Sequence, residues 1–244
     1  MAAADLVAAM SKGPDFEPVR EFYDREYYTA DEISGGHSTW HDQVVADRLG
    51  ELRGVAALDV ACGLGTWLQL LRQRGAGVAG IDISERAIAA CKQRFPDGDF
   101  RVGVAESLPF ADGSFGLVTC MGSLEHFLDK PAALREMVRV STPDARFLIL
   151  VPNAGFLTRR LGLYGGTQQT RVREDVYSLE AWGALLEGAG LRIEERWRDL
   201  HPLDWGWIRR GRPWAWPVRA AQAMALPLWP LSWQYQVHHF CRRA

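Results

Sequence analysis

From residue 55 onward, short apolar runs alternate with amphipathic stretches. Six apolar runs predict strands, at 55–61, 77–82, 99–103, 115–121, 145–151 and 191–198. Four stretches with helical periodicity lie between them, at 66–74, 84–94, 131–141 and 178–188. Strands that alternate with helices in this way predict an α/β fold, in which a mostly parallel sheet is covered by helices on both faces.

Helical periodicity also precedes this region. Apolar residues at helical spacing predict a helix over 15–28, namely Phe16, Val19, Phe22 and Tyr23. Ser38 or Thr39 is a suitable cap for a second helix, over 40–52. The tyrosines of the first helix either cover a functional site or pack on the core, and we favour packing for Tyr23, Tyr27 and Tyr28.

The C-terminal part departs from the alternation. Residues 153–177 are rich in glycine and polar residues, which predicts a loop or lid, and 233–241 predict a last strand. Residues 200–232 then form an insertion before that strand. We expect a single domain with four parts: an N-terminal helical lid at 1–53, a core at 54–199, the insertion, and a final segment at 233–244.

Composition is that of a soluble globular protein, with 48% hydrophobic and 24% charged residues. The four cysteines are widely spaced, so they predict neither a disulfide framework nor a metal cluster, and we expect no metal site. The N-terminus is a poor match to a signal peptide, and no apolar stretch reaches the roughly 20 residues of a membrane span. A cytoplasmic location fits these features.

Charge is unevenly distributed. The formal net charge is −2, but the last 40 residues carry +6 because no acidic residue follows Asp204, which leaves −8 for residues 1–204. Six of the ten tryptophans also lie in this tail. Residues 205–232 therefore form a peripheral membrane contact, a cap or dimer contact, or a nucleic-acid surface. The acidic remainder of the chain argues against nucleic acid.

A glycine turn and two acids carry the strongest functional signal. The segment LDVACGLGT, at 58–66, places Asp59 near the end of a strand and Gly63 and Gly65 in the turn that follows. Glycine lets the backbone approach a ligand, and amides at a helix start bind polar groups. Asp82 ends the next strand in GIDIS, where a carboxylate accepts hydrogen bonds from a ribose diol. These features together indicate an adenosine-containing cofactor.

Electrostatics favours S-adenosylmethionine over NAD as that cofactor. The dinucleotide turn usually has a third glycine, but Leu68 stands at that position here. Asp59 near the turn would repel a pyrophosphate and suits the cationic amine of a methionine moiety.

These motifs, with AESLPFADGSFGLV, MGSLEHF and RFLILVPN, resemble class I S-adenosylmethionine-dependent methyltransferases of the small-molecule type. The likeness covers about residues 40–200. It implies a Rossmann-like, doubly wound sheet of seven strands with an antiparallel last strand. It also implies cofactor-binding residues, carried over as Asp59, Ala61, Cys62, Gly63, Gly65, Asp82, Ile83, Ala105, Glu106, Met121, Gly122 and Leu124.

Three positions depart from the family pattern. Ala61 stands where the turn usually opens with glycine, Val104 where an aspartate is frequent, and Gly116 where an aspartate often follows the Ser-Phe pair of strand four. We interpret these differences as tuning of the site, because none of them changes Gly63, Gly65 or Asp82. Cys62 is interpreted as a small packing residue of the turn.

Methyl transfer depends mainly on alignment and desolvation, but an oxygen or nitrogen acceptor also needs a general base. His126 follows the fourth strand and is our candidate base, with a structural histidine as the alternative. We expect Glu125 to cap a helix or face solvent. For His37 and His41 we expect either a contact with cofactor or acceptor or a position on a surface helix. The segment 165–169 either binds a polar acceptor or is a solvated loop.

The sequence therefore predicts an enzyme that O-methylates a small or lipid-linked acceptor, with a sugar hydroxyl favoured. A carbon or nitrogen methyltransferase of a natural product or quinone-like acceptor is the alternative within the family. Two further hypotheses stay open: a cofactor-binding scaffold without transfer activity, and a nicotinamide oxidoreductase. We expect a homodimer only if the tail provides the contact.

Overall fold

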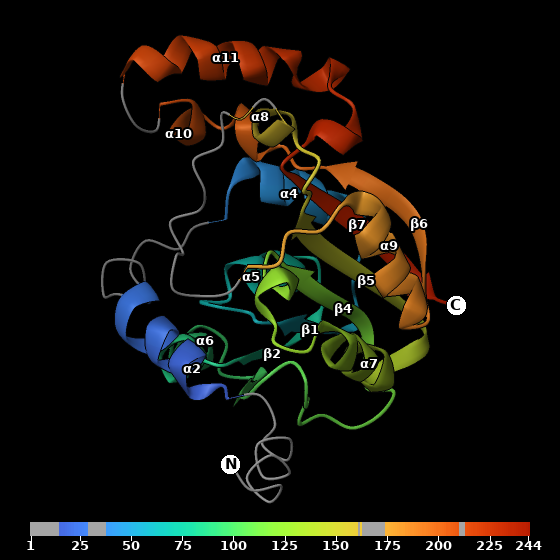
Figure 1. Ribbon diagram of the computed structural model, residues 1–244. Helices are drawn as coiled ribbons and strands as arrows, with labels where there is room; N and C mark the ends of the chain where they lie inside the picture. Colours follow the sequence, from blue (N-terminus) through green and yellow to red (C-terminus); the bar gives the residue numbers. More distant parts are fainter. Residues whose placement is uncertain (1–14, 29–37, 161, 163–173, 210–212) are drawn as a thin grey trace, which may run out of the picture.

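A seven-stranded sheet forms the centre of the computed structural model, which describes residues 15–28, 38–160, 162, 174–209 and 213–244 (Figure 1). Its strand order is β3-β2-β1-β4-β5-β7-β6, and all neighbours are parallel except β7, which is antiparallel to β5 and β6. This confirms the fold class that the sequence predicts. The strands are β1 (Ala56–Val60), β2 (Gly77–Asp82), β3 (Asp99–Val102), β4 (Phe115–Met121), β5 (Ser141–Pro152), β6 (Leu191–Arg198) and β7 (Gln236–Arg243).

Helices cover both faces of this sheet. One face packs against α7 (Lys130–Val140) and α9 (Leu179–Gly188), and the buried residues between them include Leu134, Phe147 and Trp182. The opposite face packs against α4 (Trp40–Arg48), α5 (Thr66–Gln73) and α6 (Glu85–Arg94). Because the parallel strands are covered on both sides, their carboxyl ends form one edge at which loops and ligands can gather.

Side-chain caps account for where several helices begin. Thr39 and Asp42 form a capping box at the start of α4, in which each side chain bonds the backbone of the other. Ser84, Asp129 and Ser178 accept hydrogen bonds from the first turns of α6, α7 and α9. These N-cap residues fix where each helix begins, which keeps the carboxyl edge of the sheet accessible.

The N-terminal segment consists of α2 (Glu17–Phe22) and one π-helical turn, η1 (Tyr23–Tyr27), where the sequence predicts a single helix. It docks on the start of α6. Asp24 accepts hydrogen bonds from the Ser84 hydroxyl and the Arg86 amide, and the Arg86 guanidinium donates to the Tyr28 carbonyl. These contacts hold the segment over the carboxyl ends of β1 and β2.

The insertion lies between β6 and β7. It contains η3 (His201–Leu203), α10 (Trp205–Ile208), η4 (Pro213–Ala215), α11 (Trp216–Ala225), η5 (Leu226–Leu228) and η6 (Leu231–Trp233). The last strand begins at Gln236, three residues later than the sequence predicts, because 231–233 form a 3₁₀ turn and pairing with β5 starts at Pro152. In Figure 1, α11 lies at the outer end of the molecule, beyond α10.

Two further features complete the description. A short helix, α8 (Leu157–Arg160), lies within the predicted loop after β5. Within the described part of the chain, no helix combines the length and the apolar character that a bilayer crossing requires.

Candidate functional site

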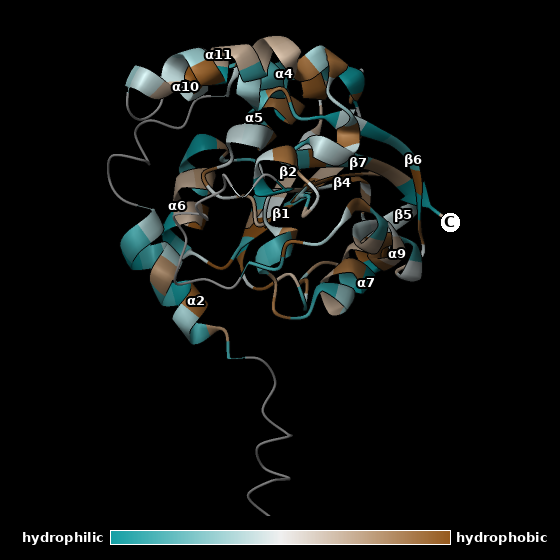
Figure 2. Cartoon of the chain, turned by 45° about the horizontal axis from the view of Figure 1, so that its top comes forward, coloured by the Kyte–Doolittle hydropathy of each residue, from teal (hydrophilic) through white to brown (hydrophobic). Residues whose placement is uncertain are grey.

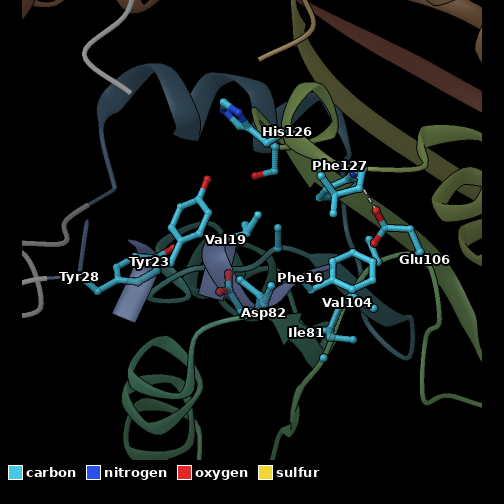
Figure 3. Close-up of a pocket in the computed structure, with 16 residues that line it drawn as sticks. Phe16, Val19, Tyr23, Tyr28, Ile81, Asp82, Val104, Glu106, His126 and Phe127 are labelled. Atoms are coloured by element: carbon cyan, nitrogen blue, oxygen red, sulfur yellow. Dashed lines mark hydrogen bonds between the residues drawn. The ribbon is translucent and has the colours of Figure 1, made fainter. Parts of the chain in front are cut away.

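A cavity opens at the carboxyl edge of the sheet, beneath the N-terminal segment (Figure 3). Its walls come from α2 and η1, the ends of β1 and β2, the segment after β3, and the turn after β4. The lining residues are Phe16, Val19, Tyr23, Tyr28, Ala61, Ile81, Asp82, Ile83, Gly103, Val104, Ala105, Glu106, Ser123, His126, Phe127 and Leu128.

Asp82 lies at the floor of this cavity (Figure 3). Its carboxylate accepts hydrogen bonds from the Gly63 amide at 2.9 Å and the Ser84 amide at 2.9 Å, so it ties the glycine turn to the end of β2. Burial raises the pKa of this carboxyl to about 6, against the lowering effect of the two amides. The group is therefore largely ionised near neutral pH and can still accept a hydrogen bond from a ligand.

The two glycines of the turn have different neighbours. Both adopt left-handed backbone, with φ +52° at Gly63 and +73° at Gly65. A Cβ at Gly63 would lie 2.9 Å from the Tyr28 hydroxyl, whereas one at Gly65 would lie 2.9 Å from the Phe95 ring and 3.0 Å from Cys91 Sγ. Gly63 thus leaves space for a group above the turn, and Gly65 lets α5 approach α6 closely.

Ala61, at the opening of the turn, also adopts left-handed backbone, with φ +60°, and it lines the cavity. Among the described residues it is the only one other than glycine with positive φ. An alanine in this conformation costs roughly 1–2 kcal/mol. The family departure noted in the sequence therefore keeps the glycine conformation and adds strain beside the ligand space.

Asp59 and Cys62 lie behind the turn and do not line the cavity. The Thr119 hydroxyl donates to Asp59 at 2.6 Å, and burial raises the pKa of the Asp59 carboxyl to about 7. Cys62 packs against Gly80, where a Cβ would come within 2.7 Å of its sulfur. The hydrogen bond with Cys91, together with burial, raises the pKa of the Cys62 thiol, which agrees with a packing residue rather than a nucleophile.

The far wall joins the segments that follow β3 and β4. Glu106 accepts hydrogen bonds from the amides of Leu128 at 2.9 Å and Asp129 at 3.2 Å. Between Glu106 and Asp82 the cavity wall is apolar and includes Ile81 and Val104 (Figure 3). An apolar wall with a carboxylate at each end suits a purine nucleoside.

The lid tyrosines are part of the site, and the sequence-based preference for plain packing is wrong for two of them. Tyr23 and Tyr28 line the cavity, and the Tyr28 hydroxyl lies directly above the glycine turn. Burial raises the pKa of both phenols, so both remain protonated donors at neutral pH. Tyr27 is exposed and contacts the rings of Tyr23 and Tyr28 edge-on.

Glu125, expected at a helix cap or in solvent, is instead 3% exposed, and its Oε2 atom has no hydrogen-bond partner among the residues that the structure describes. Burial raises the pKa of its carboxyl to about 8, so it is mainly protonated at neutral pH. It belongs to a 3₁₀ turn, η2 (Leu124–His126), in which the next residue, His126, lines the cavity. No local pattern shows this burial, because the Asp175 amide, 50 residues away in sequence, donates to the Glu125 carbonyl at 3.0 Å.

The structure thus brings some of the predicted site residues to the cavity and leaves others behind it. Ala61, Asp82, Ile83, Ala105, Glu106 and His126 line it. The remaining predicted residues support the turn or the end of β4 without lining it, namely Asp59, Cys62, Gly63, Gly65, Met121, Gly122 and Leu124.

Sequence reasoning named Val104 as a departure at the site but missed the rest of the apolar lining: Phe16, Val19, Ile81, Phe127 and Leu128. The helical spacing of Phe16, Val19 and Tyr23 was visible, but nothing local shows that this face turns toward the sheet edge. His41 lies at the start of α4 with its ring 5.8 Å from that of His201, away from the cavity lining. His37 and the segment 165–169 lie outside the described residues.

Comparisons with known proteins agree with this geometry. A family model described as a methyltransferase domain matches residues 58–149. A demethylmenaquinone methyltransferase of Renibacterium salmoninarum is 35% identical over 147 residues, which are 58% of this chain and 61% of that protein. An uncharacterized methyltransferase of Synechocystis, sll0829, is 30% identical over 166 residues, 65% of this chain and 76% of that protein.

Among solved structures, a chain from the complex between the Haloferax volcanii Trm112 methyltransferase activator and a methyltransferase superposes with a TM-score of 0.68. It is 19% identical, and the match covers 95% of this chain and 99% of that one, which establishes a shared fold. The matched regions of three demethylmenaquinone methyltransferases amount to only 55% to 61% of their length. The rest of each relative has no counterpart in the alignment.

Proposed function

This chain belongs to the class I S-adenosylmethionine-dependent methyltransferases, and we propose that it methylates a ring carbon of an apolar, quinone-like acceptor. The proposal takes up the carbon-acceptor alternative in place of the sugar hydroxyl favoured from the sequence. The segment that suggested a sugar, 165–169, lies outside the described residues. Relatives named as demethylmenaquinone and 2-phytyl-1,4-naphtoquinone methyltransferases, at 35% identity each, support a quinone-like acceptor.

The observation that carries the proposal is the apolar wall of the cavity. Phe16 and Val19 of the N-terminal segment line the same cavity as Phe127, which follows β4 (Figure 3), and Leu128. A sugar needs several polar partners for its hydroxyls, because each unpaired buried hydroxyl costs about 1–3 kcal/mol. An apolar wall instead favours a flat ring or prenyl chain, which gains from leaving water.

The residues at the other end of the cavity fit the family's methyl donor. Asp82 is positioned to accept from a ribose diol, and Ile81 and Val104 provide apolar surface for an adenine. Tyr28 sits over the turn, where its protonated hydroxyl can donate to a carboxylate. When bound, S-adenosylmethionine supplies an electrophilic methyl carbon on a sulfonium.

The chain's own residues must orient the acceptor, exclude water and remove one proton. As the new carbon–carbon bond forms and the sulfur–methyl bond breaks, the acceptor carbon loses a proton to a base. We assign that role to His126, because its side chain lines the cavity at the carboxyl end of β4. Glu125, a buried neutral acid beside it, positions the η2 turn, since its own side chain does not reach the cavity.

The test uses S-adenosylmethionine labelled with ¹³C in the methyl group and three acceptors. These are a prenylated 1,4-naphthohydroquinone that lacks the ring methyl, a glycosylated lipid and an aromatic amine. We expect the label on a ring carbon of the naphthohydroquinone, identified by its carbon shift. Label on oxygen or nitrogen would overturn the proposed acceptor. Tight binding of S-adenosylhomocysteine with no transfer to any acceptor would favour the scaffold hypothesis.

A further inference from the structure

The outer surface of the insertion carries a continuous apolar stripe. Residues spaced three or four apart along η4, α11 and η5 are all exposed and apolar, and we call them the α11 face: Trp214, Val218, Ala221, Met224 and Leu228. Trp214 is 73% exposed, Met224 76% and Leu228 89%. A surface helix of a globular protein normally turns such a stripe inward. Here it points away from the sheet, and α11 lies at the end of the molecule (Figures 1 and 2).

The inward side of α11 is fixed by its contacts. Ala223 and Leu226 are buried on this side, each about 5% exposed. The Arg219 guanidinium donates to the Trp207 carbonyl at 2.8 Å and lies 5.2 Å from the centroid of the Trp207 ring. These contacts hold the helix in one orientation, so the exposure of the α11 face does not come from a helix free to rotate.

After Asp204 the sequence carries charge of a single sign. No acidic residue occurs after Asp204, while Arg209, Arg210, Arg212 and Arg219 lie in the insertion. Arg209 is exposed and lies 5.4 Å from the centroid of the Trp205 ring, which is itself 69% exposed. Tryptophan and arginine beside aliphatic residues form the composition that binds the headgroup region of a bilayer. Because residues 1–204 carry −8, an anionic membrane would attract the insertion and repel the rest of the chain.

We propose that the α11 face docks the protein on the surface of an anionic phospholipid bilayer, with α11 parallel to the membrane plane. A nucleic acid fits less well, because Val218, Met224 and Leu228 offer aliphatic rather than stacking surfaces. Contacts between the rings of His41, His201 and Trp207 join α10 to the start of α4, so the docked surface is packed against the sheet domain. The inference does not depend on the proposed acceptor and is tested without turnover.

Sedimentation with vesicles tests the proposal directly. The full chain is mixed with vesicles of phosphatidylglycerol and phosphatidylcholine, or of phosphatidylcholine alone. We expect the wild-type protein to sediment with the anionic vesicles and to remain largely in solution with the neutral ones. The combined Val218→Ser, Met224→Ser and Leu228→Ser variant should lose at least about tenfold in partitioning, because three apolar side chains no longer enter the interface. Arg209→Gln should lose roughly fivefold with anionic vesicles.

The matched control replaces an exposed apolar residue elsewhere. Val102 of β3 is 39% exposed, and Val102→Ser should partition as the wild type does. Unfolding curves on every variant verify that it is folded. The proposal is overturned if the wild type stays in the supernatant with both vesicles or binds both equally. It is also overturned if the wild type is a dimer that the triple substitution dissociates, because the α11 face would then join two copies of the chain.

Discussion

Tryptophans of the sheet domain and of the insertion have opposite environments. Trp182 is fully buried, and its ring nitrogen donates to the Pro152 carbonyl at 2.7 Å. Trp205 and Trp214 are among the most exposed apolar residues of the described chain. The same residue type therefore contributes packing energy in one region and accessible surface in the other. Tryptophan content alone does not distinguish a core from a docking surface, whereas the partners of each ring do.

Truncating one tryptophan in each region tests whether the two environments contribute differently to stability. Trp182→Ala should lower the free energy of unfolding by about 3–5 kcal/mol, because it leaves a cavity and an unpaired Pro152 carbonyl. Trp214→Ala should change it by less than about 0.5 kcal/mol, because the side chain is solvated. Urea unfolding followed by circular dichroism measures both. Equal losses would mean that the insertion belongs to the folding core.

The two regions also differ in charge. The sheet domain buries an acid, Glu125, whereas the insertion has no acidic residue after Asp204. The pKa of Glu125 is raised from 4.5 to about 8 by burial, so the folded state holds the proton more tightly than the unfolded state. Its contribution to stability is therefore present below pH 4.5 and is lost as the pH rises to about 8. Glu125→Gln removes this loss and should raise stability at pH 7 by about 3 kcal/mol.

The measurement compares unfolding at pH 5 and pH 8 for the wild type and the variant. Asp59 and Asp82, whose pKa values are also raised, keep a slope of the same sign in both proteins. Glu51→Gln, at a side chain that is 68% exposed, is the control and should keep the wild-type slope. An unchanged slope in Glu125→Gln would show that this carboxyl is solvated.

Asp82→Asn should lower the affinity for the ligand more than it lowers the stability of the fold. The substitution removes one of the two oxygens that accept from the Gly63 and Ser84 amides, so one amide loses its partner. It also removes the charge-assisted contact to a ribose. We expect the affinity for S-adenosylhomocysteine to fall by about 1–3 kcal/mol, measured by calorimetric titration. Asp99→Asn, at the exposed start of β3, is the matched control. Unchanged affinity would remove Asp82 from the proposed site.

The smallest effect is expected at Ala61. Glycine adopts φ +60° without strain, so Ala61→Gly should raise the free energy of unfolding by about 1 kcal/mol. Thermal unfolding measures the difference. A lower melting temperature would show that Ala61 stabilises the protein more, by restricting the unfolded chain, than its backbone strain destabilises the folded state.

The sequence predicts the sheet and the cofactor side of the cavity because their signals are local. Gly63 and Asp82 are recognised within a few residues of their own strands, and parallel pairing of β1 with β2 brings them together. The acceptor side could not be predicted in this way. Phe16 and Phe127 line the same cavity only because the N-terminal segment folds over the sheet edge, an arrangement that no spacing along the chain encodes.

Predictions were also least accurate for residues whose burial depends on segments distant in the sequence. Glu125 was placed in solvent because residue type alone favours exposure of an acid, yet the segment around Asp175 covers it, with the Asp175 amide donating to the Glu125 carbonyl at 3.0 Å. The tail illustrates the same limit. Its composition leaves membrane, dimer and packing interpretations open, and only the inward contacts of Arg219 show which side of α11 remains exposed.

The position of β7 has a consequence for biosynthesis. This strand lies between β5 and β6, although it is translated after both. While the ribosome is still making the insertion, the edge of β5 has no neighbour and β6 has no strand to pair with. Such open edges invite pairing between nascent chains. We therefore expect chaperone dependence during synthesis to end only when the residues of β7 have left the exit tunnel.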